Sequence, residues 1–322
     1  MKAIVFTEYG PPEVAKLTEV PKPQPKENEI LIKVYASTVN RTDCGFRSAA
    51  YFISRFWTGL FRPKTQILGC EFAGVVEEIG SQVTQFKVGD RVFGYDDYKF
   101  GGHAEYLTIK ENKAVTTIPE KFSFTQAAPL TEGAHYALSN IKAAKVQIDQ
   151  NVMVYGASGA IGSAAVQILE YYGAKVTAVC NTSNVKMVES LGATKVVDYQ
   201  TEDFTQTDIR YDFIFDAVGK CSFAQCKPLL TPTGIYISTE LGKNAENIFL
   251  ALITPLSRGK KVLFPIPKMD KKKAVYLRKL AEKGKFRPVI DRIYPMEDIV
   301  EAYRYVESGE KIGNVILKIR EE

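Results

Sequence analysis

Three evenly spaced glycines, Gly156, Gly159 and Gly162, follow the apolar run 152–155 and open a segment of small residues. The run is typical of a buried parallel strand, and the segment after it is typical of a helix. Glycine lets the backbone approach a pyrophosphate where a Cβ would collide, and the N–H groups at a helix N-terminus bind its oxygens. The pattern predicts a dinucleotide site, although the spacing is not the usual G-x-G-x-x-G and a glycine-rich turn of another α/β protein is the alternative. The predicted phosphate-binding residues are Gly156, Ala157, Ser158, Gly159, Ala160, Ile161 and Gly162.

The second strand of this predicted domain ends without a carboxylate. Sites that prefer NADH usually carry Asp or Glu about 20 residues past the glycines, where it binds the ribose 2′-hydroxyl. Here the first acid is Glu189, and side chains suited to a 2′-phosphate precede it. We therefore expect NADPH, with the alternative that Ser183 or Asn184 only caps the next helix. The predicted 2′-phosphate residues are Asn181, Thr182, Ser183 and Lys186.

The composition excludes several classes of protein. The 322 residues, 45% hydrophobic and 25% charged, are enough for about two soluble domains. A net charge of +5, spread along the chain, gives no basic stripe for nucleic acid. No stretch approaches the roughly 18 apolar residues of a membrane span, no secretory signal is apparent, and five scattered cysteines fit a reducing compartment. We expect a cytoplasmic protein without nucleic-acid partners or integral membrane association.

Two patterns divide the chain into domains. The first 122 residues alternate short β-rich runs with Gly and Pro turns, which predicts an antiparallel, barrel-like β domain. At Ser123 a capping box opens a helix that we expect to continue through Ala137. The runs expected as strands of the β domain are 2–6, 30–39, 73–79, 91–95 and 104–109.

After this helix, strands and helices alternate, which predicts a doubly wound parallel sheet. The expected strands are 152–155, 175–180, 195–197, 212–216 and 234–238, and the expected helices are 160–172, 184–191 and 222–230. Helices near 274–284 and 297–307 and a strand at 315–319 follow. The expected domains are 1–122 with 268–322, and 123–267.

An ordered series of motifs resembles the medium-chain dehydrogenase/reductase superfamily. The resemblance covers essentially the whole chain, and it implies an α/β protein with a GroES-like β-barrel-type domain and a doubly wound Rossmann domain. Besides the glycine turn, the motifs are VNRTD at 39–43, GCEFAGVVEEIG at 69–80, FKVGDRV at 86–92, DY at 198–199, DAVG at 216–219 and GNVIL at 313–317.

The superfamily contains zinc-dependent alcohol dehydrogenases and zinc-free quinone or enone reductases. In the zinc enzymes a Cys stands at the position of Asn40, a His stands at the position of Cys70, and a third Cys lies around residues 130–132. This chain has none of the three, and it lacks a cluster of four Cys after Asp97. The resemblance therefore implies the zinc-free quinone oxidoreductase branch, in which NADPH delivers hydride to a quinone or an α,β-unsaturated carbonyl. The alternatives are a metal site improvised from Cys44, Cys70 and Glu71, a zinc alcohol dehydrogenase, and a non-catalytic NADPH-binding protein.

The resemblance also implies roles for individual residues. Asn40 would face the nicotinamide and the substrate, and Thr131 is a second candidate donor to the substrate oxygen. Tyr199 would join the 2′-phosphate site. A homodimer would form through the edge strand near residues 262–264. The residues expected along the nicotinamide ribose are Asp216, Ala217, Val218, Gly219, Ser238 and Thr239.

Residues 46–66 are rich in aromatic and basic side chains, and no acid occurs between Asp43 and Glu71. This composition suits a lid over a flat apolar substrate, and Tyr51 could donate a proton there. A helix resting on an anionic membrane surface and a helix packed on the β domain are alternatives. The predicted substrate wall consists of Tyr51, Phe52, Trp57 and Phe61.

Overall fold

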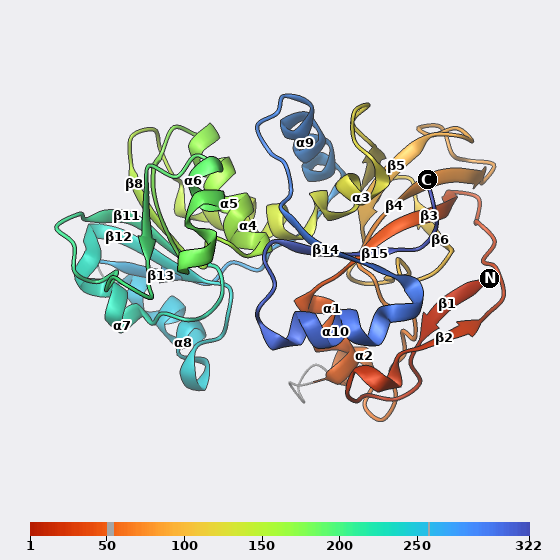
Figure 1. Ribbon diagram of the computed structural model, residues 1–322, viewed down its shortest axis with the longest axis horizontal. Helices are drawn as coiled ribbons and strands as arrows, with labels where there is room; N and C mark the ends of the chain where they lie inside the picture. Colours follow the sequence, from red (N-terminus) through yellow and green to blue (C-terminus); the bar gives the residue numbers. More distant parts are fainter. Residues whose placement is uncertain (50–54, 257) are drawn as a thin grey trace. The chain divides into compact units, whose positions relative to one another are not determined.

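The computed structural model of the chain describes residues 1–49, 55–256 and 258–322 (Figure 1). Two compact units are present: residues 1–132, 269–284 and 288–322 form the first, and residues 133–268 and 285–287 form the second. None of the helices in the described ranges is long and apolar enough to cross a membrane.

The first unit is built on a largely antiparallel sheet with the order β14-β15-β3-β4-β5-β7, in which β6 also pairs with β3. Val, Ile and Phe side chains on β3, β4 and β5 are buried, and they form a core with Leu107 and Ile109 of β6. The strands are β3 (Glu29–Val39), β4 (Glu71–Ile79), β5 (Arg91–Tyr95), β6 (Tyr106–Lys110), β7 (Val115–Thr117), β14 (Ile290–Pro295) and β15 (Asn314–Lys318), besides the separate pair β1 (Lys2–Val5) and β2 (Lys16–Glu19).

Helix α1 (Arg41–Ser48) follows β3 directly and begins at Asn40. The Asn40 side chain accepts a hydrogen bond from Asp43 N at 2.9 Å, and the Asp43 carboxylate accepts one from Asn40 N at 3.2 Å. This reciprocal capping fixes Asn40 at the end of a buried strand. The other helices of this unit are α2 (Arg55–Thr58), α3 (Phe124–Ala127), α9 (Lys271–Glu282) and α10 (Ile299–Ser308), with short 3₁₀ turns at Pro12–Val14, Ala128–Leu130 and Met296–Asp298.

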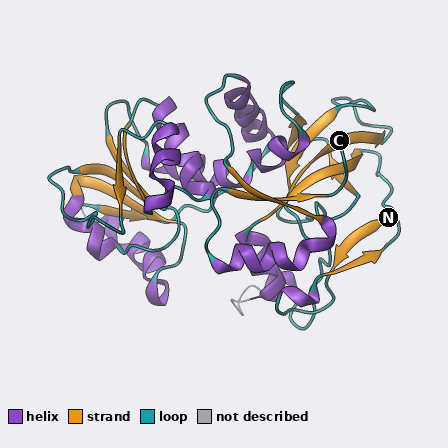
Figure 2. Cartoon of the chain, in the orientation of Figure 1, coloured by secondary structure: helices purple, strands orange, loops and turns teal. Residues whose placement is uncertain are grey.

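The second unit holds a parallel sheet with the order β10-β9-β8-β11-β12-β13. Numbered along this unit, the order is 3-2-1-4-5-6, which is that of dinucleotide-binding folds. Figure 2 shows helices on both sides of this sheet. The strands are β8 (Asn151–Tyr155), β9 (Lys175–Cys180), β10 (Lys195–Asp198), β11 (Tyr211–Asp216), β12 (Leu230–Ser238) and β13 (Lys261–Leu263).

Helix α4 (Glu132–Ala144) precedes the first of these strands, and the helices between the strands are short, apart from α5 (Ala160–Tyr171). The others are α6 (Val185–Ser190), α7 (Phe223–Cys226) and α8 (Glu246–Ile253), with 3₁₀ turns at Thr182–Asn184, Lys227–Leu229, Lys243–Ala245 and Thr254–Leu256. The predicted fold class, a GroES-like β domain with a Rossmann-type sheet, is confirmed.

Two expected helices are divided differently in the structure. The helix expected from Ser123 through Ala137 breaks at Pro129, whose ψ of 16° is not helical. Its first part, α3, belongs to the first unit, where the Phe124 ring stacks on Tyr35 at 4.4 Å, so the first unit continues past the boundary expected at residue 122. The helix expected over 222–230 ends early, because Pro228 follows α7 and Leu230 already pairs in β12.

Candidate functional site

The glycine turn of the second unit joins β8 to α5. Gly156 has a φ of +77°, and a Cβ on it would lie 2.6 Å from the Val218 side chain. A Cβ on Gly162 would overlap the carbonyl oxygen of Gly156 and lie 2.8 Å from Ala157 Cα. The left-handed backbone and the nearby Val218 side chain therefore require glycine at position 156, and the close approach of the turn to its own backbone requires it at position 162, whatever the turn binds.

Gly159 differs from these two glycines. It has an ordinary φ of −76°, and a Cβ there would touch only Gly156 O at 3.6 Å and Val218 Cγ1 at 4.0 Å. It is the N-cap residue of α5, and no side chain caps the helix. The open space beside Gly159 and the uncapped N–H groups of α5 suit a pyrophosphate, so this turn fits a dinucleotide.

The predicted 2′-phosphate residues follow β9. Ser183 and Lys186 are exposed, and their side chains make no hydrogen bond or ion pair with other residues that the structure describes. The hydroxyl of Thr182 is already donated to Asp198 Oδ2 at 2.6 Å, and Asn181 accepts a hydrogen bond from the Asn184 amide at 2.5 Å. Ser183 and Lys186 are therefore the side chains best placed to bind a phosphate. Asn184 does not cap α6 with its side chain, so the capping alternative does not explain that residue.

Asp216, at the end of β11, fixes the backbone of the loop expected along the nicotinamide ribose. Asp216 is fully buried, and its carboxylate accepts hydrogen bonds from the backbone of this loop and from the Ser238 hydroxyl at 3.3 Å. Its main-chain oxygen accepts one from Thr239 N at 3.0 Å. Asp216 thus holds the ends of β11 and β12 together. The N–H donors in the loop are Val218, Gly219, Lys220 and Cys221.

In the first unit, the structure brings together three residues that are far apart in the sequence. The Asn40 amide nitrogen lies 3.1 Å from Cys70 Sγ, and Cys70 Sγ lies 2.9 Å from Glu132 Oε2. The Thr42 hydroxyl donates to Glu132 Oε1 at 2.7 Å. Asn40 is the N-cap of α1, Cys70 precedes β4, and Glu132 opens α4. Sequence reasoning missed Glu132 and Thr42.

Thr131 and Glu71 form a second part of this cluster. Glu71 Oε1 accepts hydrogen bonds from the Thr131 hydroxyl at 2.6 Å, from Thr131 N at 3.1 Å and from Glu132 N at 2.6 Å. The Thr38 hydroxyl donates to Glu71 Oε2 at 2.8 Å. Because Thr131 is fully buried and its hydroxyl hydrogen is donated to Glu71, the structure does not support the predicted donation from Thr131 to a substrate oxygen.

Burial shifts the pKa values of the ionisable groups in this cluster. Burial, followed by the charges of Glu71 and Asp43, raises the pKa of Glu132 to about 8. Burial also raises the pKa of Asp43 to about 7, although Gly69 N and Asn40 N donate to its carboxylate. The pKa of the Cys70 thiol is raised well above its ordinary value by burial and by the charge of Glu132.

The donor set of the cluster does not fit a zinc ion. Zinc in proteins is bound by thiolates, free imidazole nitrogens and carboxylates, whereas Cys70 is a buried thiol that donates to Glu132, and the Glu71 carboxylate already accepts hydrogen bonds from Thr131, Glu132 N and Thr38. The His103 Nε2 atom lies 2.7 Å from Thr38 O, and its Nδ1 atom lies 3.4 Å from the Tyr303 hydroxyl. Within the described ranges, no group of three or more His, Cys, Asp or Glu side chains is arranged to hold a metal ion. Cys44 packs with Val39 and Tyr303, in a different cluster from Cys70, so the improvised site does not form.

The predicted substrate wall is described only in part. Tyr51 and Phe52 lie outside the described residues, and for Trp57 only its place on α2 is described. Phe61 is 87% exposed. On α2, the Thr58 hydroxyl lies 2.7 Å from the Tyr9 hydroxyl, so this end of the segment is attached to the N-terminal part of the unit.

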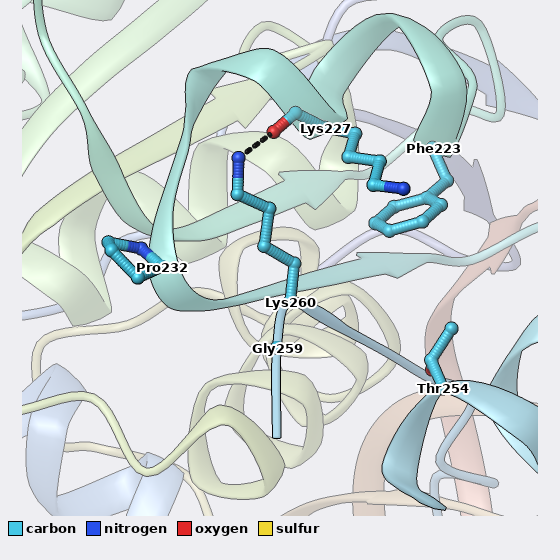
Figure 3. A pocket seen from close by; sticks show the side chains of 6 residues that line it. All are labelled: Phe223, Lys227, Pro232, Thr254, Gly259 and Lys260. Carbon is cyan, nitrogen blue, oxygen red and sulfur yellow. Dashed lines mark hydrogen bonds between the residues drawn. The ribbon is translucent and has the colours of Figure 1, made fainter. Parts of the chain in front are cut away.

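The second unit has a cavity of about 370 Å³, which is separate from the predicted cofactor-binding residues of that unit. The Lys260 ammonium donates to Lys227 O at 2.6 Å beside it (Figure 3). None of its lining residues belongs to the glycine turn or to the two strand ends described above, so we do not assign the cofactor to it. The cavity is lined by Phe223, Lys227, Pro232, Thr254, Gly259 and Lys260.

Comparisons with known proteins agree with the two-domain fold. Residues 26–120 match the model of the alcohol dehydrogenase GroES-like domain, and residues 191–317 match that of the zinc-binding dehydrogenases. The 2-methylene-furan-3-one reductase of Solanum lycopersicum is 32% identical, and the chloroplastic NADPH-dependent alkenal/one oxidoreductase of Arabidopsis thaliana is 30% identical, each over 98% of this chain and 79% of the relative. The structure of the quinone oxidoreductase from Coxiella burnetii matches with a TM-score of 0.87 and 29% identity, over 99% of both chains.

Proposed function

The chain belongs to the medium-chain dehydrogenase/reductase superfamily, and from this we propose that it is an NADPH-dependent reductase of quinones and α,β-unsaturated carbonyls that needs no zinc. The observation that carries the proposal most is the turn at Gly159, which is open and uncapped where a pyrophosphate would bind. The named activities of the relatives support the choice of acceptor. The thiol and amide at the positions of the zinc ligands support the absence of a metal.

In this proposal, NADPH supplies the hydride and the protein binds, orients and screens the reactants. The backbone from Gly156 to Gly162 binds the pyrophosphate, and Ser183 and Lys186 bind the 2′-phosphate. Asp216 fixes the loop that passes the nicotinamide ribose. Asn40 contacts the nicotinamide and the substrate, and its amide is held in one orientation by Cys70 Sγ and Asp43 N.

We also propose a homodimer formed through the second unit. Strand β13 ends the sheet, and α8 with the turn after it exposes a row of large apolar side chains beside that edge. Such a patch is typical of an interface. Its residues are Ile248, Phe249, Leu252, Ile253 and Leu256, of which Phe249, Leu252 and Leu256 are 63%, 69% and 88% exposed. Cytoplasmic localisation stays a prediction.

Turnover with a panel of acceptors tests the proposed activity. We expect NADPH oxidation with small naphthoquinones, phenanthrenequinone or alkenals, weaker activity with NADH, and negligible oxidation of ethanol with NADP, because no metal lowers the pKa of an alcohol. Prior treatment with a chelator should leave these rates unchanged. Tight NADPH binding without turnover of any acceptor would instead identify a non-catalytic binding protein, and loss of activity on removal of bound zinc would contradict zinc independence.

A further inference from the structure

Glu132 lies at the centre of the chain of hydrogen bonds in the first unit. Its side chain is 8% exposed, with the Cys70 thiol on Oε2 and the Thr42 hydroxyl on Oε1. Asn40, beyond Cys70, and Thr42 are both half-buried. This series of hydrogen bonds therefore connects the buried carboxyl group of Glu132 to the partly exposed polar side chains of Asn40 and Thr42.

The direction of these hydrogen bonds determines where a proton on Glu132 would reside. The Asn40 amide donates to Cys70 Sγ, and the thiol hydrogen is donated to Oε2. Oε2 is therefore an acceptor, and Oε1 is the oxygen that can carry a hydrogen. A hydroxyl group can both donate and accept, so the 2.7 Å contact between Oε1 and Thr42 Oγ1 suits a proton on either oxygen.

Glu71 favours this protonated state of Glu132. The Glu71 carboxylate accepts four hydrogen bonds, from the backbone and hydroxyl of Thr131, from Glu132 N and from Thr38, and these stabilise its charged form. Among the described residues, an ionised Glu132 would accept only two, from the neutral Cys70 and Thr42 side chains. Two neighbouring buried carboxyl groups resist a second charge, so the proton resides on Glu132. This agrees with a Glu132 pKa of about 8.

Asp43 and Lys311 are the other ionisable groups whose charges act in this region. Asp43 adds to the rise in the Glu132 pKa. Burial lowers the pKa of Lys311, whose ammonium donates to Gly313 O at 2.7 Å and interacts with Glu132 only by charge. Lys311 therefore does not hold Glu132 in an ion pair.

We propose that Glu132 holds the proton that completes the reduction of an enone and delivers it through the Thr42 hydroxyl, an inference that rests on the function proposed above. Hydride addition at the β-carbon leaves an enolate. The Thr42 O–H bond breaks and its proton goes to the enolate, while the Glu132 O–H bond breaks and its proton goes to Thr42 Oγ1. The substrate thereby gains one hydride and one proton, and water returns a proton to the Glu132 carboxylate.

The variant Glu132→Gln tests this role, because the amide keeps the size of the side chain and cannot give up a proton. General acid catalysis contributes on the order of 100-fold or more, so we expect kcat with an enone to fall by roughly that factor. A quinone needs less help, because charge on its reduced oxygen is delocalised, so its rate should fall far less. Loss of structure would lower both rates alike. NADPH affinity should not change.

The pH profile and matched variants sharpen the test. Because the acid form is required, the wild-type enone rate should fall as the pH rises through about 8, the pKa of Glu132, and Glu132→Gln should lose this dependence. Thr42→Val should lower the enone rate as Glu132→Gln does, and Thr42→Ser should retain it. Glu29→Gln, which makes the same change at a buried carboxyl that contacts Lys99, should leave the profile intact.

Infrared titration separates this inference from the proposed function. The wild type should show the carbonyl stretch of a carboxylic acid at neutral pH, lost as the pH rises through about 8 and absent from Glu132→Gln. An absent band, or an unchanged enone rate in Glu132→Gln, would overturn the role of Glu132 and leave the reductase activity standing. A wild type that reduces no acceptor would overturn the proposed function, and with it the delivery step, even if the band is present.

Discussion

Lys186 is the exposed cation in the first turn of α6, next to the end of β9. Because the sequence has no carboxylate at that strand end, we propose that the Lys186 ammonium distinguishes a 2′-phosphate from a 2′-hydroxyl. We predict that Lys186→Ala weakens NADPH binding by roughly 10- to 100-fold and leaves NADH binding nearly unchanged. Titration of both cofactors measures this difference.

The control for this change is Lys195→Ala, which removes an exposed lysine from the start of β10 in the same unit. It should leave both affinities unchanged. Equal losses for NADPH and NADH in Lys186→Ala, or a wild type that prefers NADH, would contradict the assignment of the 2′-phosphate site.

Single residues were predictable where the chemistry is local. The glycine turn and the missing carboxylate after β9 can be read from neighbouring positions. Glu132 could not be found in this way, because its partners Cys70 and Thr42 are 62 and 90 residues away in the sequence. The position of Thr131 in the sequence suggests a hydrogen-bond donor, and only the fold shows that its hydroxyl group is donated to Glu71.

At the scale of the elements, two glycines of the turn between β8 and α5 have different roles. Gly162 is required for folding of the turn, and Gly159 is proposed to be required for binding of the cofactor. Gly159→Ala should leave the unfolding temperature nearly unchanged, because a Cβ there meets nothing closer than 3.6 Å. It should nevertheless weaken NADPH binding, because that Cβ would occupy the space that we propose for the pyrophosphate.

Gly162→Ala is the matched variant in the same turn. Its Cβ would overlap Gly156 O, so we expect destabilisation by about 1–3 kcal/mol even without cofactor. Thermal unfolding and NADPH titration of both variants measure the contrast. If Gly159→Ala binds NADPH as the wild type does, the pyrophosphate does not bind at this turn.

Elements with a strong pattern agree closely with the sequence-based expectation, and the others do not. The strands of the parallel sheet are buried apolar runs, and β8, β9 and β11 lie within one residue of the expected bounds. Neither β2 nor β14 has a buried residue, so neither shows the apolar pattern of a core strand. Helix α1 is short and is specified by the capping of Asn40 rather than by an apolar face.

At the scale of the whole molecule, the apolar side chains of α8 lead to a prediction about assembly. Leu252→Glu places a charge in the proposed interface and should convert a dimer to a monomer. Analytical ultracentrifugation of the wild type and the variant measures the change. Val88→Glu, at another exposed apolar position, is the control and should not alter the mass. A monomeric wild type would contradict the proposed homodimer.

The proposed reaction of the whole molecule is transfer of hydride from NADPH to a conjugated acceptor without zinc. The most direct measurement uses chelator-treated protein of verified metal content, NADPH deuterated at the transferring C4 position, and an alkenal or enone as acceptor. NMR of the saturated product should show deuterium at the β-carbon and a solvent proton at the α-carbon, at the rate of the untreated protein. Product without deuterium, no product from a protein that binds NADPH, or activity that returns only with added zinc would contradict the account.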